Sequence, residues 1–138
     1  MPFVVWITGL PGAGKSTISA ELIKQLSAAG ITANYLRLDA IRKRLVAVPR
    51  YDDAERDYVY SKLASIAAEE HEKGMSVLID ATAHKRSYRD AARNRIKNFV
   101  EVNVKCDLDT CIDRESHRPG GLVAADLYNK ALDRKNGK

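Results

Sequence analysis

Apolar residues recur with two different periods along this chain of 138 residues, and the two periods alternate. Short runs of apolar, mostly β-branched or aromatic side chains have the length of buried strands, and they occupy residues 3–8, 31–38, 76–80 and 99–105. The segments that follow them are predicted to be helices, at residues 18–26, 40–47, 52–73, 85–96, 108–114 and 122–134. Strands that alternate with helices predict an α/β fold of three layers, with helices on both faces of a mainly parallel sheet.

Glycine and proline mark the boundaries of these elements. Gly30 and Gly74 stand where helices end and suit C-terminal caps, and Pro49 cannot continue the helix before it. Residues 115–121 contain a Pro-Gly-Gly sequence and predict a mobile loop, within a lid of about residues 114–130. No linker or repeat divides the sequence, so a single domain over residues 1–138 is expected.

A phosphate-binding loop is predicted between the first strand and the first helix. Its spacing is G-x-x-x-x-G-K-[ST], and the nucleotide-binding residues that it predicts are Gly9, Leu10, Pro11, Gly12, Ala13, Gly14, Lys15, Ser16 and Thr17. The glycines let backbone amides wrap around an anion, and the N-terminus of the following helix adds partial positive charge. Lys15 is a predicted catalytic residue that supplies a full charge to the phosphates, and the Ser16 hydroxyl is a predicted Mg²⁺ ligand. ATP and Mg²⁺ are therefore the predicted cofactors.

Two carboxylates follow predicted strands, at the edge of the sheet where the phosphate-binding loop also lies. Asp39 is the predicted catalytic carboxylate, which accepts a proton from an acceptor hydroxyl or holds Mg²⁺ through water. Asp80 occupies the Walker B position at the end of the third strand and predicts a water-mediated Mg²⁺ contact. Each has a structural alternative, because an aspartate after a strand also caps the next helix or turn.

Three arginines are candidates for anion binding. Arg42 lies one helical turn after Asp39, and Arg56 lies near the start of the long helix, so both are predicted to bind an anionic acceptor. Arg114 begins the lid and is predicted to contact the nucleotide, where its charge would stabilise the transferring phosphoryl group. The alternatives are a surface position for Arg42 and Arg114, and an ion pair with Asp52 for Arg56.

Charge and composition narrow the choice of partners. The net charge of +5 suits a small anionic substrate, and nucleic acid is the less favoured partner because the basic residues are spread over several segments. No apolar run approaches the roughly 20 residues of a membrane span, and the N-terminus lacks a signal-peptide pattern, so a cytoplasmic protein without a membrane partner is expected. Cys106 and Cys111 are expected to be reduced thiols. A homodimer is left open.

Several of these motifs together resemble the adenylylsulfate (APS) kinases, which move the γ-phosphoryl group of ATP to the 3′-hydroxyl of adenylyl sulfate. The matching stretches are Val-Trp-Ile-Thr-Gly-Leu-Pro-Gly-Ala-Gly-Lys-Ser-Thr at residues 5–17, Asp-Ala-Ile-Arg at 39–42, Glu-Arg at 55–56, Cys-Ile-Asp-Arg-Glu at 111–115 and Leu-Tyr-Asn-Lys-Ala at 127–131. The resemblance implies that Asp39 is the catalytic or Mg²⁺-organising carboxylate. It further implies that Arg42 and Arg56 hold the acceptor and that Arg114 lies in the lid.

The chain departs from that family's pattern at several positions. Arg37 and Leu38 stand where the family has the first Asp and the Gly of its D-G-D element, and Asp80-Ala81-Thr82 replaces its Ser-Pro segment. The same Asp-Ala-Thr segment, together with the D-x-x-R spacing of residues 39–42 before a long helix, also looks like kinases of the polynucleotide-kinase type.

One function is favoured and two others stay open. The favoured function is an ATP-dependent small-molecule kinase that phosphorylates the 3′-hydroxyl of adenylyl sulfate to give PAPS. The alternatives are a polynucleotide-kinase-like or other metabolite kinase of the P-loop class, and a nucleotide-binding protein without kinase activity.

Overall fold

The computed structural model describes residues 2–117, which alternate between strands and helices. In chain order the elements are β1 (Val4–Thr8), α1 (Lys15–Ala28), β2 (Ala33–Arg37), α2 (Leu38–Leu45), α3 (Asp53–Glu72), β3 (Ser76–Asp80), α4 (Arg86–Arg95), β4 (Phe99–Asn103) and α5 (Leu108–His117). The predicted α/β alternation is confirmed over these residues. None of the helices in this part of the chain is long and apolar enough to cross a membrane.

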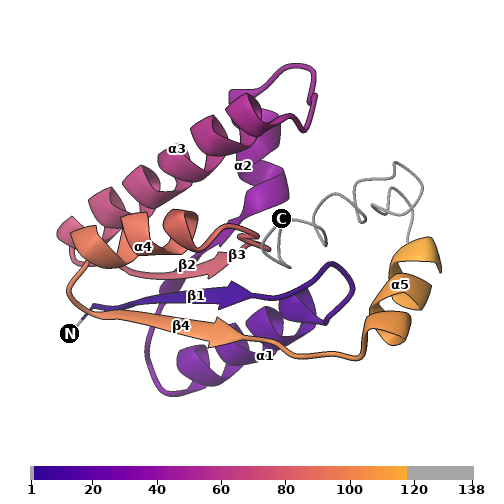
Figure 1. Cartoon of the computed structure of the whole chain (residues 1–138). Coiled ribbons are helices and arrows are strands. Elements are labelled where there is room, and N and C mark those ends of the chain that lie inside the picture. Colours follow the sequence, from indigo (N-terminus) through magenta and orange to yellow (C-terminus); the bar gives the residue numbers. More distant parts are fainter. Residues whose placement is uncertain (1, 118–138) are drawn as a thin grey trace.

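The strands of this region form one sheet in the order β2-β3-β1-β4, and each neighbouring pair is parallel. Figure 1 shows α2, α3 and α4 on one face of the sheet and α1 on the other, which is the predicted three-layer arrangement. The connection that leaves β1 runs through α1 on one face of the sheet, and the connection that leaves β3 runs through α4 on the other face. The crevice between the ends of these two strands is therefore a topological switch point, where α/β folds commonly bind ligands.

Alternating side chains of the strands fill two cores, one on each face of the sheet. Val4 and Trp6 point into the α2–α4 layer, where Trp6 is fully buried and stacks on Tyr60 with ring centroids 6.2 Å apart. Val5 and Ile7 point the other way and pack with residues of α1 and α5. This burial on both faces explains why β1 is a continuous apolar run instead of an alternating one.

Several element boundaries differ from the sequence expectation, among them the start of α2 and the extent of α5. Leu38 was expected to end the second strand, but it is the first residue of α2 and packs into the core. Helix α5 reaches His117, the last residue that the structure describes, and so includes the first residues of the predicted loop 115–121. The rest of that loop, the predicted helix 122–134 and the polar tail lie outside the described residues.

Candidate active site

The phosphate-binding loop joins β1 to α1, and Gly12 and Gly14 in it hold conformations that other residues rarely adopt. Gly14 has φ 100° and immediately precedes α1, so the first free amides of the helix face the loop. Gly12 has φ 84°, and a Cβ there would collide with the carbonyl of Cys111 on α5. Lys15 Nζ donates a hydrogen bond to the Leu10 carbonyl at 3.1 Å, which holds its ammonium over the loop. The loop thus has the backbone shape and the charge that an anion requires.

Asp80, at the end of β3, lies beside the first turn of α1 and is only 7% exposed. Its Oδ2 accepts hydrogen bonds from Ser16 Oγ at 2.8 Å and from the Tyr35 hydroxyl at 2.6 Å. Burial, followed by the hydrogen bond to Asp80, raises the pKa of Tyr35 above its ordinary value of 10.0, so the phenol remains a donor near neutral pH. The structure therefore brings together the hydroxyl and the carboxylate that the sequence assigns to Mg²⁺, and it adds a tyrosine from β2.

A cleft opens between the phosphate-binding loop and the ends of β2 and β3. Its lining residues are Pro11, Lys15, Ser16, Arg37, Leu38, Asp39, Asp80, Ala81 and Thr82. Asp39 is exposed here in the first turn of α2. The structural alternative for Asp39, a cap of this helix, is wrong, because α2 begins at Leu38 and Arg37 holds the N-cap position. Asp39 instead lines the cleft together with Lys15 and Ser16 of the phosphate-binding loop.

The oxygen donors in this cleft fit a magnesium ion. Among the described residues, no group of three or more His, Cys, Asp or Glu side chains could hold a metal by itself. Mg²⁺ usually keeps several waters and takes one or two carboxylates together with the phosphates of its substrate. Ser16 Oγ and Asp80, already 2.8 Å apart, supply a hydroxyl and a carboxylate beside the loop that would carry the phosphates. The donor set therefore suits a metal that arrives with a nucleotide.

Arg42 is buried, so the alternative that it is an ordinary surface arginine is wrong. It is 6% exposed, and its guanidinium carbon lies 4.8 Å from the centroid of the Tyr51 ring. Its Nε is buried and has no hydrogen-bond partner. A buried charged donor without a partner costs free energy, and an anionic ligand at this position would recover that cost.

Arg56 on α3 is a second buried guanidinium, also 6% exposed. Its Nη1 lies 3.9 Å from Asp53 Oδ1 and lacks a hydrogen-bond partner. The pairing with Asp52 is not formed: one oxygen of that carboxylate accepts a hydrogen bond from the Glu55 amide at 2.8 Å and caps α3, and the other lies 3.4 Å from Arg50 Nε. Helices α2 and α3 thus each bury an arginine that is incompletely paired.

A buried carboxylate organises the turn that covers Arg42. Glu55 is 4% exposed, and its Oε2 accepts hydrogen bonds from the backbone amides of Arg50, at 2.9 Å, and of Tyr51. These bonds hold Tyr51 at a positive φ of 58° with its ring over the Arg42 guanidinium. Sequence reasoning missed this arrangement, although a glutamate three residues after the aspartate cap is typical of a capping box.

Arg114 extends from α5 to the phosphate-binding loop. Its Nη1 donates a hydrogen bond to the Gly12 carbonyl at 3.1 Å and approaches Cys106 Sγ at 3.8 Å. The side chain is solvent-exposed, yet it is anchored on the loop that the sequence predicts it to serve. Both cysteines are free, as expected for reduced thiols. Beyond residue 117, the predicted lid of residues 114–130 lies outside the described residues.

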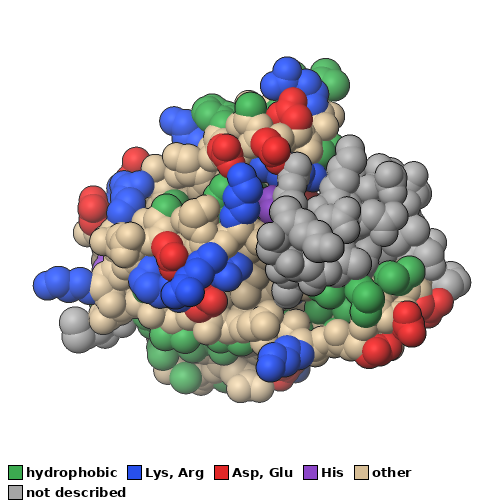
Figure 2. Space-filling model, in the orientation of Figure 1, with side chains coloured by type: hydrophobic (Ala, Val, Ile, Leu, Met, Phe, Trp, Pro, Cys, Tyr) green, Lys and Arg blue, Asp and Glu red, His purple; other side chains and the backbone are tan. Residues whose placement is uncertain are grey.

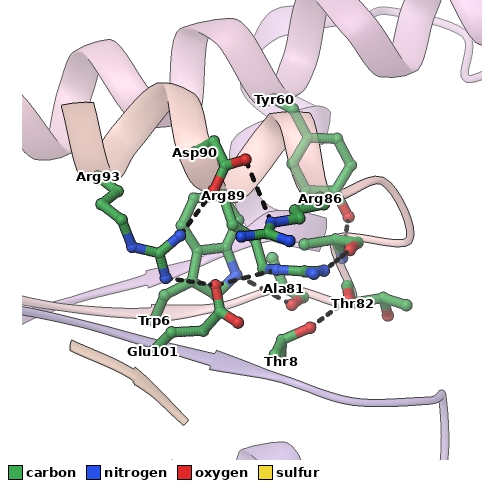
Figure 3. Close-up of polar contacts among 11 residues, drawn as sticks. Trp6, Thr8, Tyr60, Ala81, Thr82, Arg86, Arg89, Asp90, Arg93 and Glu101 are labelled. Carbon is green, nitrogen blue, oxygen red and sulfur yellow. Dashed lines mark hydrogen bonds and ion pairs between the residues drawn. The ribbon is translucent and has the colours of Figure 1, made fainter. Parts of the chain in front are cut away.

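The loop after β3 forms one wall of the cleft and is fastened to β1 by two side chains (Figure 3). Trp6 Nε1 donates a hydrogen bond to the Ala81 carbonyl at 3.2 Å, and Thr8 Oγ1 donates one to the Thr82 carbonyl. Both donors come from the strand that leads into the phosphate-binding loop. These bonds therefore fix the loop after β3 against the strand that precedes the phosphate-binding loop.

Helices α3 and α4 hold the next residue of that loop. Ala83 has φ 50°, which is uncommon for a residue with a Cβ, and its amide donates a hydrogen bond to the Tyr60 hydroxyl at 2.8 Å. Arg89 donates to the Ala83 carbonyl and, at 3.0 Å, to Glu101 on β4, an acceptor that it shares with Arg93. Figure 2 shows Lys and Arg side chains gathered over α4 with Asp and Glu side chains among them. The basic helix is thus partly neutralised and helps to hold the cleft wall.

His84 follows this loop and lies edge-on to two tyrosine rings. Its ring centroid is 6.2 Å from that of Tyr60 and 5.4 Å from that of Tyr88. Burial, followed by the charge of Lys85, lowers the pKa of His84 below its ordinary value of 6.5, while burial raises the pKa of Tyr60 to about 12. Near neutral pH His84 is therefore a neutral imidazole, and its buried Nε2 has no hydrogen-bond partner.

Several known proteins resemble this chain in both sequence and fold. The profile described as adenylylsulphate kinase matches residues 1–135. The "Probable adenylyl-sulfate kinase" of Archaeoglobus fulgidus is 33% identical over 132 residues, 96% of this chain and 80% of that protein. The cytidine diphosphoramidate kinase of Campylobacter jejuni is 29% identical over 97% of this chain and 74% of its own length. Other relatives are longer, and the chain spans 57% of one from Pseudomonas aeruginosa.

The same relationship is visible in three dimensions. The APS kinase of Mycobacterium tuberculosis, solved in complex with AMPPNP and APS, matches this structure with a TM-score of 0.78 at 31% identity. The match covers 89% of this chain and 72% of that one. From its sequence and its fold together, the chain belongs to the adenylylsulphate kinase family.

Proposed function

We propose that this chain is an ATP-dependent kinase that transfers the γ-phosphoryl group of ATP to the 3′-hydroxyl of adenylyl sulfate, giving PAPS and ADP. The observation that carries the proposal is that Lys15 and Ser16 of the phosphate-binding loop line the same cleft as Asp39. A site that only binds a nucleotide needs no carboxylate at that position, whereas transfer to a hydroxyl needs a group that orients the acceptor. Membership of the adenylylsulphate kinase family makes adenylyl sulfate the first acceptor to test.

On the nucleotide side, the loop amides and Lys15 would bind the β- and γ-phosphates. Ser16 and Asp80 would hold Mg²⁺, directly or through water, and the ion when bound neutralises charge that develops on the phosphates. Arg114 already contacts the loop through the Gly12 carbonyl, so a short movement of its side chain would bring the guanidinium to the nucleotide. These positions support the roles that the sequence motif predicts.

On the acceptor side, Arg42 and Arg56 would bind the anionic groups of adenylyl sulfate. Both guanidiniums are already desolvated and each has a nitrogen without a hydrogen-bond partner. Charge-assisted hydrogen bonds to sulfate or phosphate oxygens are short and strong, and arginine can make two of them in parallel. The folding cost of burying these charges would thus be partly recovered when the acceptor binds.

The chemical step would rest mainly on positioning. Asp39 would accept a hydrogen bond from the 3′-hydroxyl and take its proton as the hydroxyl oxygen attacks the γ-phosphorus. The new oxygen–phosphorus bond would form as the bond to the β–γ bridging oxygen breaks, and Lys15 would offset the charge that moves onto the leaving ADP.

A nucleoside diphosphate derivative is the second acceptor class to consider. Arg37 is exposed and lines the cleft beside Asp39 and Asp80, so it could bind an additional acidic group of an acceptor. A relative that aligns with 97% of this chain at 29% identity is named cytidine diphosphoramidate kinase. This class differs from adenylyl sulfate in its base and in the group beyond the first phosphate.

An acceptor panel tests the proposal. Purified protein with MgATP would be offered adenylyl sulfate, cytidine diphosphoramidate and a 5′-hydroxyl oligonucleotide, and the products would be identified by mass spectrometry. We expect rapid formation of PAPS, lost in Lys15→Ala and retained in Lys24→Ala, which removes an exposed lysine of α1. If ATP binds and no acceptor is consumed, the chain is a nucleotide-binding protein and the kinase proposal fails.

A further inference from the structure

Tyr35 connects strand β2 to the carboxylate at the end of β3. The register pairs Arg37 with Asp80 and Tyr35 with Leu78, so Tyr35 is the diagonal neighbour of Asp80 on the neighbouring strand. Residues two apart along a strand share a face of the sheet, and that face is the one covered by α1, where Leu78 packs. The phenol therefore reaches Asp80 from the side of α1, where Ser16 also lies.

The two hydroxyls that bind Asp80 share one of its oxygens. Ser16 Oγ lies 2.8 Å and the Tyr35 hydroxyl 2.6 Å from Oδ2. A serine that ligates a metal through its oxygen keeps its hydrogen to donate, so the bond from Ser16 to Asp80 is compatible with metal binding. Tyr35 occupies the remaining acceptor direction of the same oxygen, which fixes the rotation of the carboxylate.

We propose that Tyr35 is a positioning residue that orients the Asp80 carboxylate toward Ser16 and thereby sets the affinity of the enzyme–nucleotide complex for Mg²⁺. This inference rests on the proposed function, in which Ser16 and Asp80 hold the metal of MgATP. It assigns Tyr35 no contact with the phosphates or with the acceptor. Loss of the phenol oxygen should therefore change metal binding selectively.

The test is Tyr35→Phe, which removes one oxygen and keeps the ring between β2 and α1. Calorimetric titration of MgCl₂ into the complex of the full chain with ADP should show a Mg²⁺ dissociation constant raised about tenfold, since outer-shell partners of metal ligands typically contribute 10- to 100-fold to affinity. Binding of ADP in EDTA should stay within about twofold of the wild type. The rate with adenylyl sulfate should fall at low Mg²⁺ and recover at saturating Mg²⁺, with the acceptor KM unchanged.

A matched control is Tyr58→Phe, which removes the hydroxyl of a tyrosine on α3 that is 46% exposed. It should leave Mg²⁺ binding unchanged. If wild-type protein binds ADP equally well with and without Mg²⁺, the proposed metal site itself fails, and the inference fails with it. If Mg²⁺ tightens ADP binding equally in wild type and Tyr35→Phe, only the inference is overturned, and the phenol serves merely to join two strands. A lowered melting temperature of Tyr35→Phe without a change in Mg²⁺ affinity would overturn the inference in the same way.

Discussion

Arg114 donates a hydrogen bond to the Gly12 carbonyl at 3.1 Å, and so joins α5 to a loop 102 residues earlier in the chain. One turn before Arg114, the carbonyl of Cys111 packs directly against Gly12. The phosphate-binding loop and the helix that begins the predicted lid are therefore in contact through both backbone and side chain. A disturbance at this contact is expected to alter nucleotide binding more than it alters the rest of the fold.

Gly12→Ala tests that contact. The substitution places a Cβ at φ 84°, which costs about 1–2 kcal/mol in the left-handed region, and it also forces the new atom into the carbonyl of Cys111. We expect a loss of stability greater than the backbone cost alone and a large rise in the dissociation constant for ATP. Urea denaturation and calorimetry of ATP binding provide the two measurements.

Gly30→Ala is the matched control for that substitution. Gly30 follows α1 at φ 81°, and a Cβ there meets no atom within 4 Å. It should therefore cost about 1 kcal/mol of stability from backbone strain and leave ATP binding unchanged. Equal losses of stability and unaltered ATP binding in both variants would show that the contact between Gly12 and α5 has no role.

Arg42→Met tests whether the buried guanidinium is present for a ligand. Methionine has a similar length and needs no hydrogen-bond partner, and replacing an incompletely paired buried charge with an apolar side chain is often neutral or stabilising. We expect the free energy of unfolding to stay within about 1 kcal/mol of the wild type. The KM for the acceptor should rise about tenfold or more through the lost charge-assisted bonds, with the KM for ATP unchanged.

The control for Arg42→Met is Arg44→Met, on the same helix at an exposed position. It should change neither stability nor the acceptor KM by much. A large loss of stability in Arg42→Met with a normal acceptor KM would instead make Arg42 a structural residue that stacks on Tyr51.

The pattern of apolar residues predicted the layers and the strands, because both follow from which side chains are buried. Every residue of β3 is buried, and such a run has few alternatives to a central parallel strand. The phosphate-binding loop was predictable for a different reason, because its glycines and lysine follow one another in the sequence. Asp39 and Asp80 were found because parallel strands all end at one edge of the sheet.

Contacts between side chains from distant elements were beyond the sequence pattern. The bond from Tyr35 to Asp80 depends on the strand order β2-β3-β1-β4. Nothing in the sequence around Tyr35 distinguishes it from a tyrosine that only packs in the core. The burial of Arg42 depends on Tyr51, whose positive φ is held by Glu55. Charged residues are normally exposed, so a pattern of helical faces assigns such arginines to the surface.

Asp39→Asn tests the proposed role of the carboxylate in the chemical step. The amide keeps the size of the side chain but cannot take a proton, so kcat for the acceptor reaction should fall by about 10²–10⁴-fold. The KM for ATP should change little, because the proposed mechanism assigns Asp39 to the acceptor and not to the nucleotide. Steady-state kinetics at saturating acceptor provide the measurement, with Asp109→Asn, an exposed residue of α5, as the control. An unchanged kcat would exclude Asp39 from the proton transfer.

His84→Phe tests how the cleft wall responds to acid. Burial and the charge of Lys85 hold the pKa of His84 below 6.5, so between its folded pKa and 6.5 the unfolded chain binds more protons than the native protein. The stability that comes from keeping the imidazole neutral is therefore present above pH 6.5 and is lost as the pH falls through that window. Phenylalanine keeps a ring beside the stacked rings of Tyr60 and Tyr88 but does not titrate.

Urea denaturation of wild type and His84→Phe at a series of pH values measures this contribution. The free energy of unfolding of the wild type should fall more steeply below about pH 6.5 than that of the variant. The comparison is made above the range in which carboxylates titrate, because a charged His84 also lowers the pKa of Asp57. The direction of the difference is informative. An imidazole held in an ion pair would have a raised pKa, and the protein would then become more stable relative to the variant as the pH falls. Parallel curves would mean that His84 is as well solvated in the folded protein as in the unfolded chain, in conflict with its edge-on packing against the two tyrosines.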